Sequence, residues 1–144
     1  MNKVGLKELI EIKTIVIAIV LVLVLFAACG EAEREPTAQE LALKAAEESY
    51  EALYSGHVET FLNTRAGADS FDADYRQMLL AAYTSHALQV NTVHHGMDSI
   101  RGTRAVMDST LNLMQTFLTL YFADGTTEEI VVPMVKQGDS WMLK

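Results

Sequence analysis

Hydrophobic positions divide the chain into an apolar N-terminal run, a region of helical periodicity and a region of short apolar strands. Residues 14–29, TIVIAIVLVLVLFAAC, carry no charge. From Thr37 onward, apolar residues recur with the period of an amphipathic helix. From Met97 to the C-terminus, β-branched and apolar runs are separated by turn residues. The pattern therefore predicts helices first and an antiparallel sheet second.

The first predicted helix has one apolar face and one charged face. Thr37 and Glu40 have the spacing of a capping box, in which each side chain satisfies an otherwise unpaired backbone N–H, and Gly56 supplies a stop. The face that we expect to be buried consists of Ala42, Ala45, Ala46, Ser49, Tyr50 and Leu53. The opposite face, which we expect in solvent, consists of Glu40, Lys44, Glu47, Glu48 and Glu51.

Two more helices are predicted before the strands. Val58, Phe61 and Leu62 indicate a short helix that ends near Gly67. A third helix begins around residues 70–72, where acidic side chains suit the positive end of the helix dipole. Its apolar stripe, which we also expect to be buried, consists of Tyr75, Met78, Leu79, Ala82, Tyr83 and His86.

Four strands are predicted, at about residues 97–107, 110–123, 126–136 and 140–144. Gly102 interrupts the first strand, which is typical of a bulge. Asp124-Gly125 indicates a two-residue hairpin turn between the second and third strands. Such a turn would place Phe122 opposite Thr127.

In this register, both faces of the hairpin are apolar, whereas a face in contact with water would alternate apolar and polar residues. The three helices cover one face, so we expect the other face to pair with a second copy of the domain. The residues predicted to form this dimer face are Phe117, Ile130, Val132 and Met134. The alternative is that a bulge resets the register and leaves one face less apolar.

The order of elements and the C-terminal segment MDSTLNLMQTFLTLYFADGTTEEIVVPMVKQGDSWMLK resemble a known superfamily, that of nuclear transport factor 2 and ketosteroid isomerase. Within it, the segment is similar to small bacterial lipoproteins that carry a domain of unknown function. The resemblance covers about Thr37 to Lys144 and implies a cone-shaped α+β fold, with N-terminal helices packed on a curved antiparallel sheet. Such folds commonly dimerise through the outer sheet face and host enzymes, ligand binders and scaffolds alike. The isomerase's catalytic aspartate and tyrosine match no motif here.

The apolar run of residues 14–29 is short for a membrane span, which needs about 17–25 residues, and three lysines precede it. It ends in Leu25-Phe26-Ala27-Ala28-Cys29, which resembles the lipobox of bacterial lipoproteins and contains the chain's one cysteine. The resemblance implies a signal peptide over residues 1–28, a lipid on Cys29, an acidic tether over residues 29–36 and one α+β domain over residues 37–144. We therefore expect a bacterial cell-envelope location, with the domain anchored to a membrane by its lipid. The alternatives are an uncleaved anchor and a secreted protein.

Net charge narrows the range of partners. The first 28 residues hold three of the 11 basic and two of the 19 acidic residues, which leaves eight basic and 17 acidic residues, a net charge of −9. A negative domain is repelled by phosphate backbones, which argues against nucleic-acid binding. The acidity also keeps an exported domain soluble.

One set of residues is a candidate interior pocket. Tyr50, Tyr83, His86 and Trp141 would converge inside a cone fold, and a His–Tyr set would suit a small ligand or proton transfer near neutral pH. The alternative is a histidine satisfied in a packed core, which we favour because no carboxylate stands at a spacing that would orient the ring. We expect no metal or cofactor, since neither His94-His95 nor any glycine-rich stretch completes a motif. The function that we expect is binding or scaffolding, and the alternative is an envelope enzyme or small-ligand binder that uses this pocket.

Overall fold

The computed structural model describes Gly5, residues 7–17 and residues 34–144. Residues 7–17 are helical, and the chain divides into one unit up to residue 35 and a second over Pro36–Lys144. The predicted lipidation site Cys29 and most of the predicted tether lie outside the described residues, so both stay predictions. None of the helices in the described part of the chain is long and apolar enough to cross a membrane.

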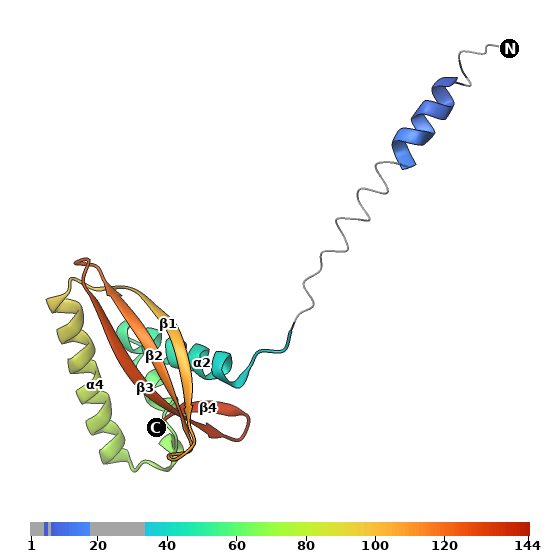
Figure 1. Ribbon diagram of the computed structural model, residues 1–144. Coiled ribbons are helices and arrows are strands. Elements are labelled where there is room, and N and C mark those ends of the chain that lie inside the picture. Colours follow the sequence, from blue (N-terminus) through green and yellow to red (C-terminus); the bar gives the residue numbers. More distant parts are fainter. Residues whose placement is uncertain (1–4, 6, 18–33) are drawn as a thin grey trace. The chain divides into compact units, whose positions relative to one another are not determined.

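The second unit is an α+β domain in which helices precede a curved antiparallel sheet, as predicted (Figure 1). The sheet has four strands in sequence order, β1-β2-β3-β4. In chain order the elements are α2 (Ala38–Tyr54), α3 (Val58–Asn63), the 3-10 turn η1 (Ala68–Ser70), α4 (Ala73–Val93), β1 (Met97–Asp108), β2 (Leu113–Phe122), β3 (Thr127–Gln137) and β4 (Ser140–Leu143).

Helix α2 begins as the sequence predicts and buries most of the predicted side, but Glu47, predicted in solvent, is half-buried against β1. The N–H of Thr37 donates to Oε2 of Glu40 at 2.7 Å, and the N–H of Glu40 donates to the Thr37 hydroxyl at 3.2 Å, which completes the capping box. The buried side of α2 consists of Ala42, Ala46, Ser49, Leu53 and Tyr54. The small side chains of Ala42, Ala46 and Ser49 let the helix lie close to the sheet.

Helix α4 buries a different side from the predicted one. Tyr75 and Met78 are 41% and 57% exposed, and His86 is exposed as well. No Asp, Glu, Lys or Arg occurs between Arg76 and Asp98, so the polar pattern marks no solvent side. The side that packs on the other helices and the core includes Leu80, Tyr83, Ala87, Val90 and Asn91.

Strand β1 bends where Gly102 approaches α2. The pairing of β1 with β2 shifts between Gly102 and Arg104, as expected for a bulge. A Cβ at Gly102 would lie 2.7 Å from Cδ1 of Leu43 on α2. The N–H of Gly102 also donates to a carboxylate oxygen of Glu47. Glycine therefore lets the helix and the strand come close.

The hairpin between β2 and β3 has a three-residue loop, so the predicted two-residue turn is wrong. The N–H of Phe122 donates to the Thr126 carbonyl at 3.0 Å. The N–H of Gly125 donates to the Phe122 carbonyl at 3.0 Å, and Gly125 has φ of +83°. This is the geometry of a type I turn followed by a left-handed residue. Thr127 consequently pairs with Tyr121 and not with Phe122.

This shift of one residue separates the four residues predicted to form a dimer face. Directly paired residues of an antiparallel ladder lie on the same face. Val132 and Met134 are buried among the helix-facing residues, and Ile130 packs beside them. Phe117 pairs with Val131 on the outer side of the sheet. The buried β2 residues that share the helix side are Met114, Thr116, Leu118, Leu120 and Phe122.

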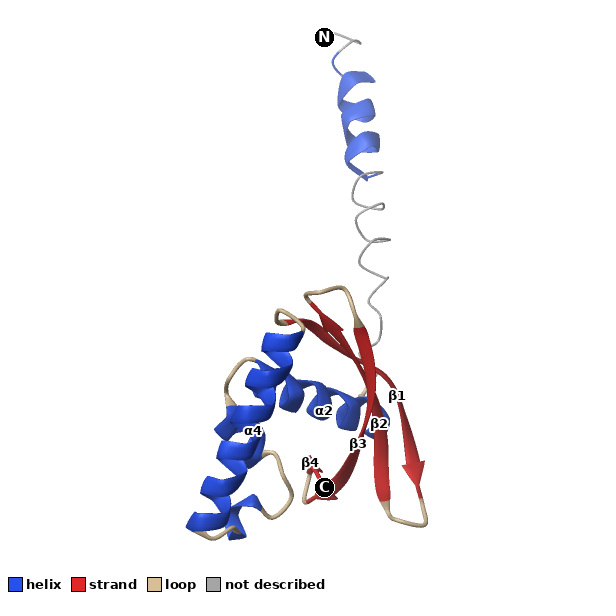
Figure 2. Cartoon of the chain, turned by 90° about the vertical axis from the view of Figure 1, so that its left-hand side faces the viewer, coloured by secondary structure: helices blue, strands red, loops and turns tan. Residues whose placement is uncertain are grey.

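The helices form a layer on one side of the sheet (Figure 2). Helix α2 packs on the sheet, and α4 packs on α2 and α3. The core between α2 and the sheet is filled by apolar side chains, among which Leu118, Leu120 and Met134 are almost completely buried. This arrangement leaves one side of α4 without a covering element in the domain.

Candidate functional site

Five rings form a continuous chain across the three helices. Tyr83 packs edge-on against Phe61 at 4.9 Å between ring centroids, and Phe61 packs edge-on against Tyr50 at 5.5 Å. Tyr50 lies 6.3 Å from Tyr54, which lies 6.1 Å from His86. The predicted pocket residues Tyr50, Tyr83 and His86 are therefore in one cluster. They pack against neighbouring rings, and such edge-on pairs stabilise a core by about 0.5–1.5 kcal/mol each.

At one end of this series of rings lies a tyrosine–histidine pair. The hydroxyl of Tyr54 lies 3.3 Å from Nε2 of His86, within hydrogen-bond distance. Burial raises the pKa of Tyr54 to about 12 and also raises the pKa of Tyr50. Both phenols are thus protonated at neutral pH. In the described part of the chain, no carboxylate is hydrogen-bonded to His86, so nothing there orients the ring as a general base.

Arg65 lies at the other end of the series of rings, against Tyr83. Its Nη1 donates to the Tyr83 hydroxyl at 2.8 Å, and its Nη2 donates to the Lys144 carbonyl at 3.1 Å. The N–H of Ala66 also donates to the Leu143 carbonyl at 2.7 Å. These bonds tie the segment after α3 to the C-terminal strand, and they leave the Tyr83 hydroxyl engaged in structure.

Trp141, the fourth predicted pocket residue, lies elsewhere and lines an open cleft. It pairs with Lys136 across β3 and β4. The cleft has a volume of about 530 Å³ and lies between the start of α2 and the strands, lined by Ala38, Gln39, Met107, Asn112, Met114, Val135, Lys136 and Trp141. We name it the Trp141 cleft. Met114 is buried, and Trp141 and Val135 are half-buried, so its walls are apolar. Its exposed polar residues are Gln39, Asn112 and Lys136.

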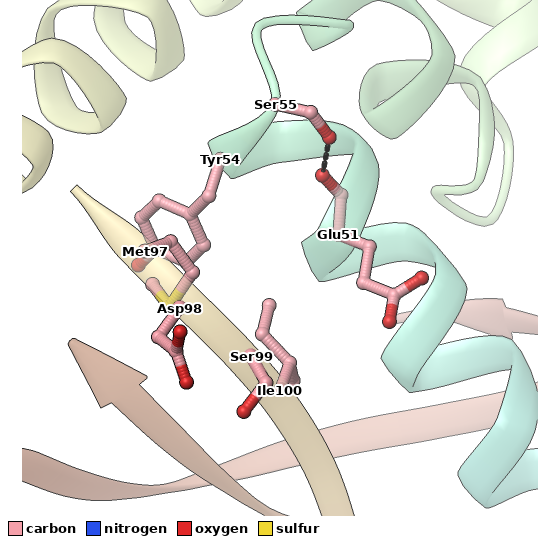
Figure 3. Close-up of a pocket in the computed structure, with 7 residues that line it drawn as sticks. All are labelled: Glu51, Tyr54, Ser55, Met97, Asp98, Ser99 and Ile100. Atoms are coloured by element: carbon pink, nitrogen blue, oxygen red, sulfur yellow. Dashed lines mark hydrogen bonds between the residues drawn. The ribbon is translucent and has the colours of Figure 1, made fainter. Parts of the chain in front are cut away.

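A second, polar cleft of about 350 Å³ lies between the end of α2 and the start of β1 (Figure 3). Its lining residues are Glu51, Tyr54, Ser55, Met97, Asp98, Ser99 and Ile100. Figure 3 shows the hydrogen bond that the Ser55 hydroxyl donates to the Glu51 backbone carbonyl. The sequence missed this cleft because Glu51 belongs to the charged side of a helix and Asp98 to a strand far along the chain.

A third polar group links the end of α4 to the β2–β3 turn. Nδ1 of His94 donates to Oδ2 of Asp124 at 2.9 Å, and the Thr126 hydroxyl donates to Oδ1 at 2.6 Å. The His94 ring stacks on Phe122 at 4.0 Å. Hydrogen bonds from the Thr126 side chain and N–H, followed by His94, lower the pKa of Asp124 to about 2. Among the described residues, no three His, Cys, Asp or Glu side chains gather to form a metal site.

The outer side of the sheet carries an apolar centre that is partly covered. The guanidinium of Arg104 lies 3.4 Å from the Phe117 ring centroid, a cation–π contact. Val131 beside it is 52% exposed, and Val106 is similarly exposed. Of the residues predicted for a dimer face, Phe117 is the one that lies on this side.

Comparison with known proteins gives one structural neighbour. No protein-family model matches the sequence, and no curated protein matches it. A solved structure from Campylobacter jejuni, described as an NTF2-like transpeptidase, superposes with a TM-score of 0.57 at 12% sequence identity. The match covers 69% of this chain and 94% of that one. At this identity the likeness establishes the fold alone. The helices and curved four-stranded antiparallel sheet of Pro36–Lys144 have an NTF2-like fold.

Proposed function

We propose that this protein is a lipid-anchored binding module of the bacterial cell envelope, and that its ligand occupies the Trp141 cleft. The ligand class is an amphiphile with an elongated apolar body and an anionic head. The observation that carries the proposal is the composition of the cleft, which combines apolar walls with one cation at its edge. Binding without catalysis is the activity that this composition supports.

The side chains of the Trp141 cleft suit an apolar body. Met107 and Met114 offer flexible thioethers that adapt to irregular ligands. Trp141 offers a large apolar ring. Ligand sites of this kind combine mostly apolar walls with a few polar groups that fix orientation.

The polar residues favour an anionic head. Lys136 is exposed at the edge of the cleft, and the lining includes no carboxylate. Gln39 and Asn112 add amide donors. In a domain with net negative charge, a cation in a cleft lining that has no carboxylate is the feature that would attract an anionic group.

The fluorescence of Trp141 offers a direct test, because it is the only tryptophan in the chain. The domain of residues 30–144 is suitable, since the entire core lies within Pro36–Lys144. Titration with myristate, below the concentration at which it forms micelles, should give a saturable shift of the emission spectrum. Met107→Glu should weaken binding by about tenfold or more, which corresponds to about 1.4 kcal/mol.

Met78→Glu is the matched control, because Met78 on α4 is also an exposed methionine, at 57% against 47% for Met107, and lies outside the cleft. It should leave the affinity for myristate unchanged. Equal weakening by the two substitutions, or no saturable signal with the unsubstituted domain, would overturn the proposed ligand site.

The anchor has its own test. Cys29→Ser removes the thiol that would carry the lipid, so the full-length variant should move from the membrane fraction to the soluble fraction. A variant that still sediments with membranes would contradict lipid anchoring at Cys29. The ligand site is tested independently of the anchor, by the fluorescence titration of Trp141.

Pairing of two copies is the remaining part of the proposal. A lipid on Cys29 would confine copies to one membrane surface and raise their local concentration, so that a weak contact would suffice. The outer sheet face is a poor surface for this contact, because the guanidinium of Arg104 already covers Phe117.

An enzyme that uses the polar cleft of Figure 3 is the second candidate, favoured by the contact between Tyr54 and His86. The C. jejuni neighbour is described as a transpeptidase, and acyl transfer of that kind needs a nucleophile activated by a base. In the cleft, the hydroxyl of Ser55 donates to a backbone carbonyl instead. The geometry therefore supports binding better than catalysis.

A further inference from the structure

Helix α4 carries a largely apolar stripe, most of which is exposed on the domain surface. Tyr75, Met78 and Val93 are 41%, 57% and 62% exposed. With their neighbours at helical spacing they form one surface, which we name the α4 stripe: Tyr75, Met78, Leu79, Ala82, His86, Gln89 and Val93. The stripe lies about a third of a turn from the side that packs on α2 and α3, at 3.6 residues per turn.

The stripe differs from the rest of the domain surface in its charge. Residues 29–144 have a net charge of −9, but no Asp, Glu, Lys or Arg occurs between Arg76 and Asp98. An exposed helix of a soluble protein ordinarily carries charges on its solvent side. A long, exposed and uncharged apolar surface is typical of an interaction site.

We propose that the α4 stripe is the contact between two copies of this chain, with the two α4 helices antiparallel. This inference rests on the pairing of copies in the proposed function and assigns its surface. Two like-charged domains repel each other wherever their acidic surfaces meet, whereas the side chains of the stripe add no charge repulsion to a contact.

The order of residues along the stripe fits a two-fold axis. Tyr75 and Val93 are equally far from residue 84, and so are Ala82 and His86. An antiparallel pair centred there would place Tyr75 of one copy against Val93 of the other, and Ala82 against His86, in both directions. This reciprocity is what an isologous interface requires. The small side chain at Ala82 lets the helix axes approach to about 8 Å.

The size of the surface predicts a weak dimer. A helix of 21 residues is about 31 Å long, and a face about 10 Å wide would bury roughly 600 Å² from both copies together. A specific stable interface buries about 1,200 Å² or more. Free domains should therefore pair only at high concentration, on the order of millimolar, whereas anchored domains reach such concentrations on a membrane.

A membrane surface is the occupant that the stripe fits less well. Helices that lie in a bilayer interface are rich in Lys and Arg on their polar side, which attracts them to anionic lipids. From Gln77 to Val93, α4 has neither residue. A net-negative domain would also be repelled by anionic headgroups.

Cross-linking through a single introduced cysteine tests this inference. Cys29 is the only cysteine in the sequence, so residues 30–144 contain none and an acylated Cys29 has no free thiol. The Ala82→Cys protein, acylated at Cys29 and reconstituted in phosphatidylglycerol vesicles, should be cross-linked to dimers by a short bis-maleimide. Val131→Cys on the outer side of the sheet should not. The free domain of residues 30–144 with Ala82→Cys should give the same dimer near millimolar concentration.

Two neighbouring substitutions provide the matched pair. In the Ala82→Cys background, Met78→Glu places a charge in the stripe and should reduce the dimer yield by about tenfold or more. Gln77→Glu places the same charge on the opposite side of α4 and should leave the yield unchanged.

Each outcome decides the inference. Cross-linking at Val131→Cys in place of Ala82→Cys would keep the pairing of copies but overturn the α4 surface. Absence of cross-linking in both forms would overturn the pairing itself. Equal sensitivity to Met78→Glu and Gln77→Glu would also overturn the assigned surface. Dimerisation of the free domain, together with recovery of the full-length chain in the soluble fraction, would retain the α4 contact while rejecting the membrane anchor.

Discussion

Helices α2 and α4 are both predicted from apolar periodicity, yet only α2 buries the predicted side. On α2, Glu40, Lys44, Glu48 and Glu51 mark the solvent side, and the opposite side is packed on the sheet. On α4, apolar residues surround the helix, and the most regular stripe is the exposed one. Charged positions were thus what made the prediction for α2 succeed.

The difference shows what periodicity measures. An apolar stripe records that a surface is removed from water, without recording what covers it. On α2 the cover is the domain's own sheet. On α4, the side with the weaker pattern packs on α2 and α3, and we propose that a second copy covers the other side. An apolar stripe on a helix that has no charged opposite side can therefore mark either the core of the domain or a contact with another molecule.

The largest expected effect comes from placing the same charge on each helix. Ala46 on α2 is completely buried, so Ala46→Glu would bury an unpaired carboxylate and should cost more than about 3 kcal/mol of unfolding free energy. Ala82→Glu on α4 is exposed and should change this free energy by less than about 0.5 kcal/mol. Urea unfolding of residues 30–144 at micromolar concentration measures both. Similar losses for the two variants would show that the α4 stripe is part of the monomer's core.

A smaller effect is expected where α2 meets the bulge in β1. Gly102→Ala would place its Cβ against the Leu43 side chain and should destabilise the domain by about 1–3 kcal/mol through overpacking. The double variant with Leu43→Ala should recover part of this loss, because it removes the clashing atoms. A loss that Leu43→Ala does not relieve would place the cause in the backbone of β1.

The capping box of α2 offers a third test. Thr37→Ala removes the hydroxyl that accepts from the Glu40 N–H and should cost about 1 kcal/mol of unfolding free energy. Thr37→Ser keeps the hydroxyl and should stay close to the unsubstituted domain. Urea unfolding with residues 30–144 separates the two, and equal losses would rule out the cap as the cause.

The smallest expected effect is at the end of α4 that contacts the hairpin. The pKa of Asp124 is lowered to about 2, mainly by the hydrogen bonds from Thr126 and then by His94. Its carboxylate therefore stabilises the fold fully above the ordinary pKa of 3.8, and this contribution is lost as pH falls from about 4 toward 2.

Unfolding free energy measured across this pH range should fall less steeply for Asp124→Asn than for the unsubstituted domain. Asp139→Asn, in the turn before β4, serves as the exposed control and should keep the original slope. If the slope for Asp124→Asn is unchanged, the ionised Asp124 carboxylate and its bonds to His94 and Thr126 contribute nothing to stability.

The candidate site was less predictable than the fold. Aromatic residues in the helices marked the cluster of Tyr50, Tyr83 and His86, but the pattern placed Trp141 with them. Trp141 is instead in a cleft with Met107 and Met114, because β4 returns along β3 at the far end of the sheet. Residues that line this cleft come from both ends of the domain sequence. No local spacing relates them.

The sequence by itself determined the elements of this protein. Capping residues, turn residues and periodicity act over a few positions, so the helices, the bulge at Gly102 and the four strands follow from local chemistry. Tertiary structure decided the register of the hairpin, the buried side of α4 and the clefts. One extra loop residue moves a strand's side chains to the other face, and packing between distant elements chooses a face when the local pattern offers two.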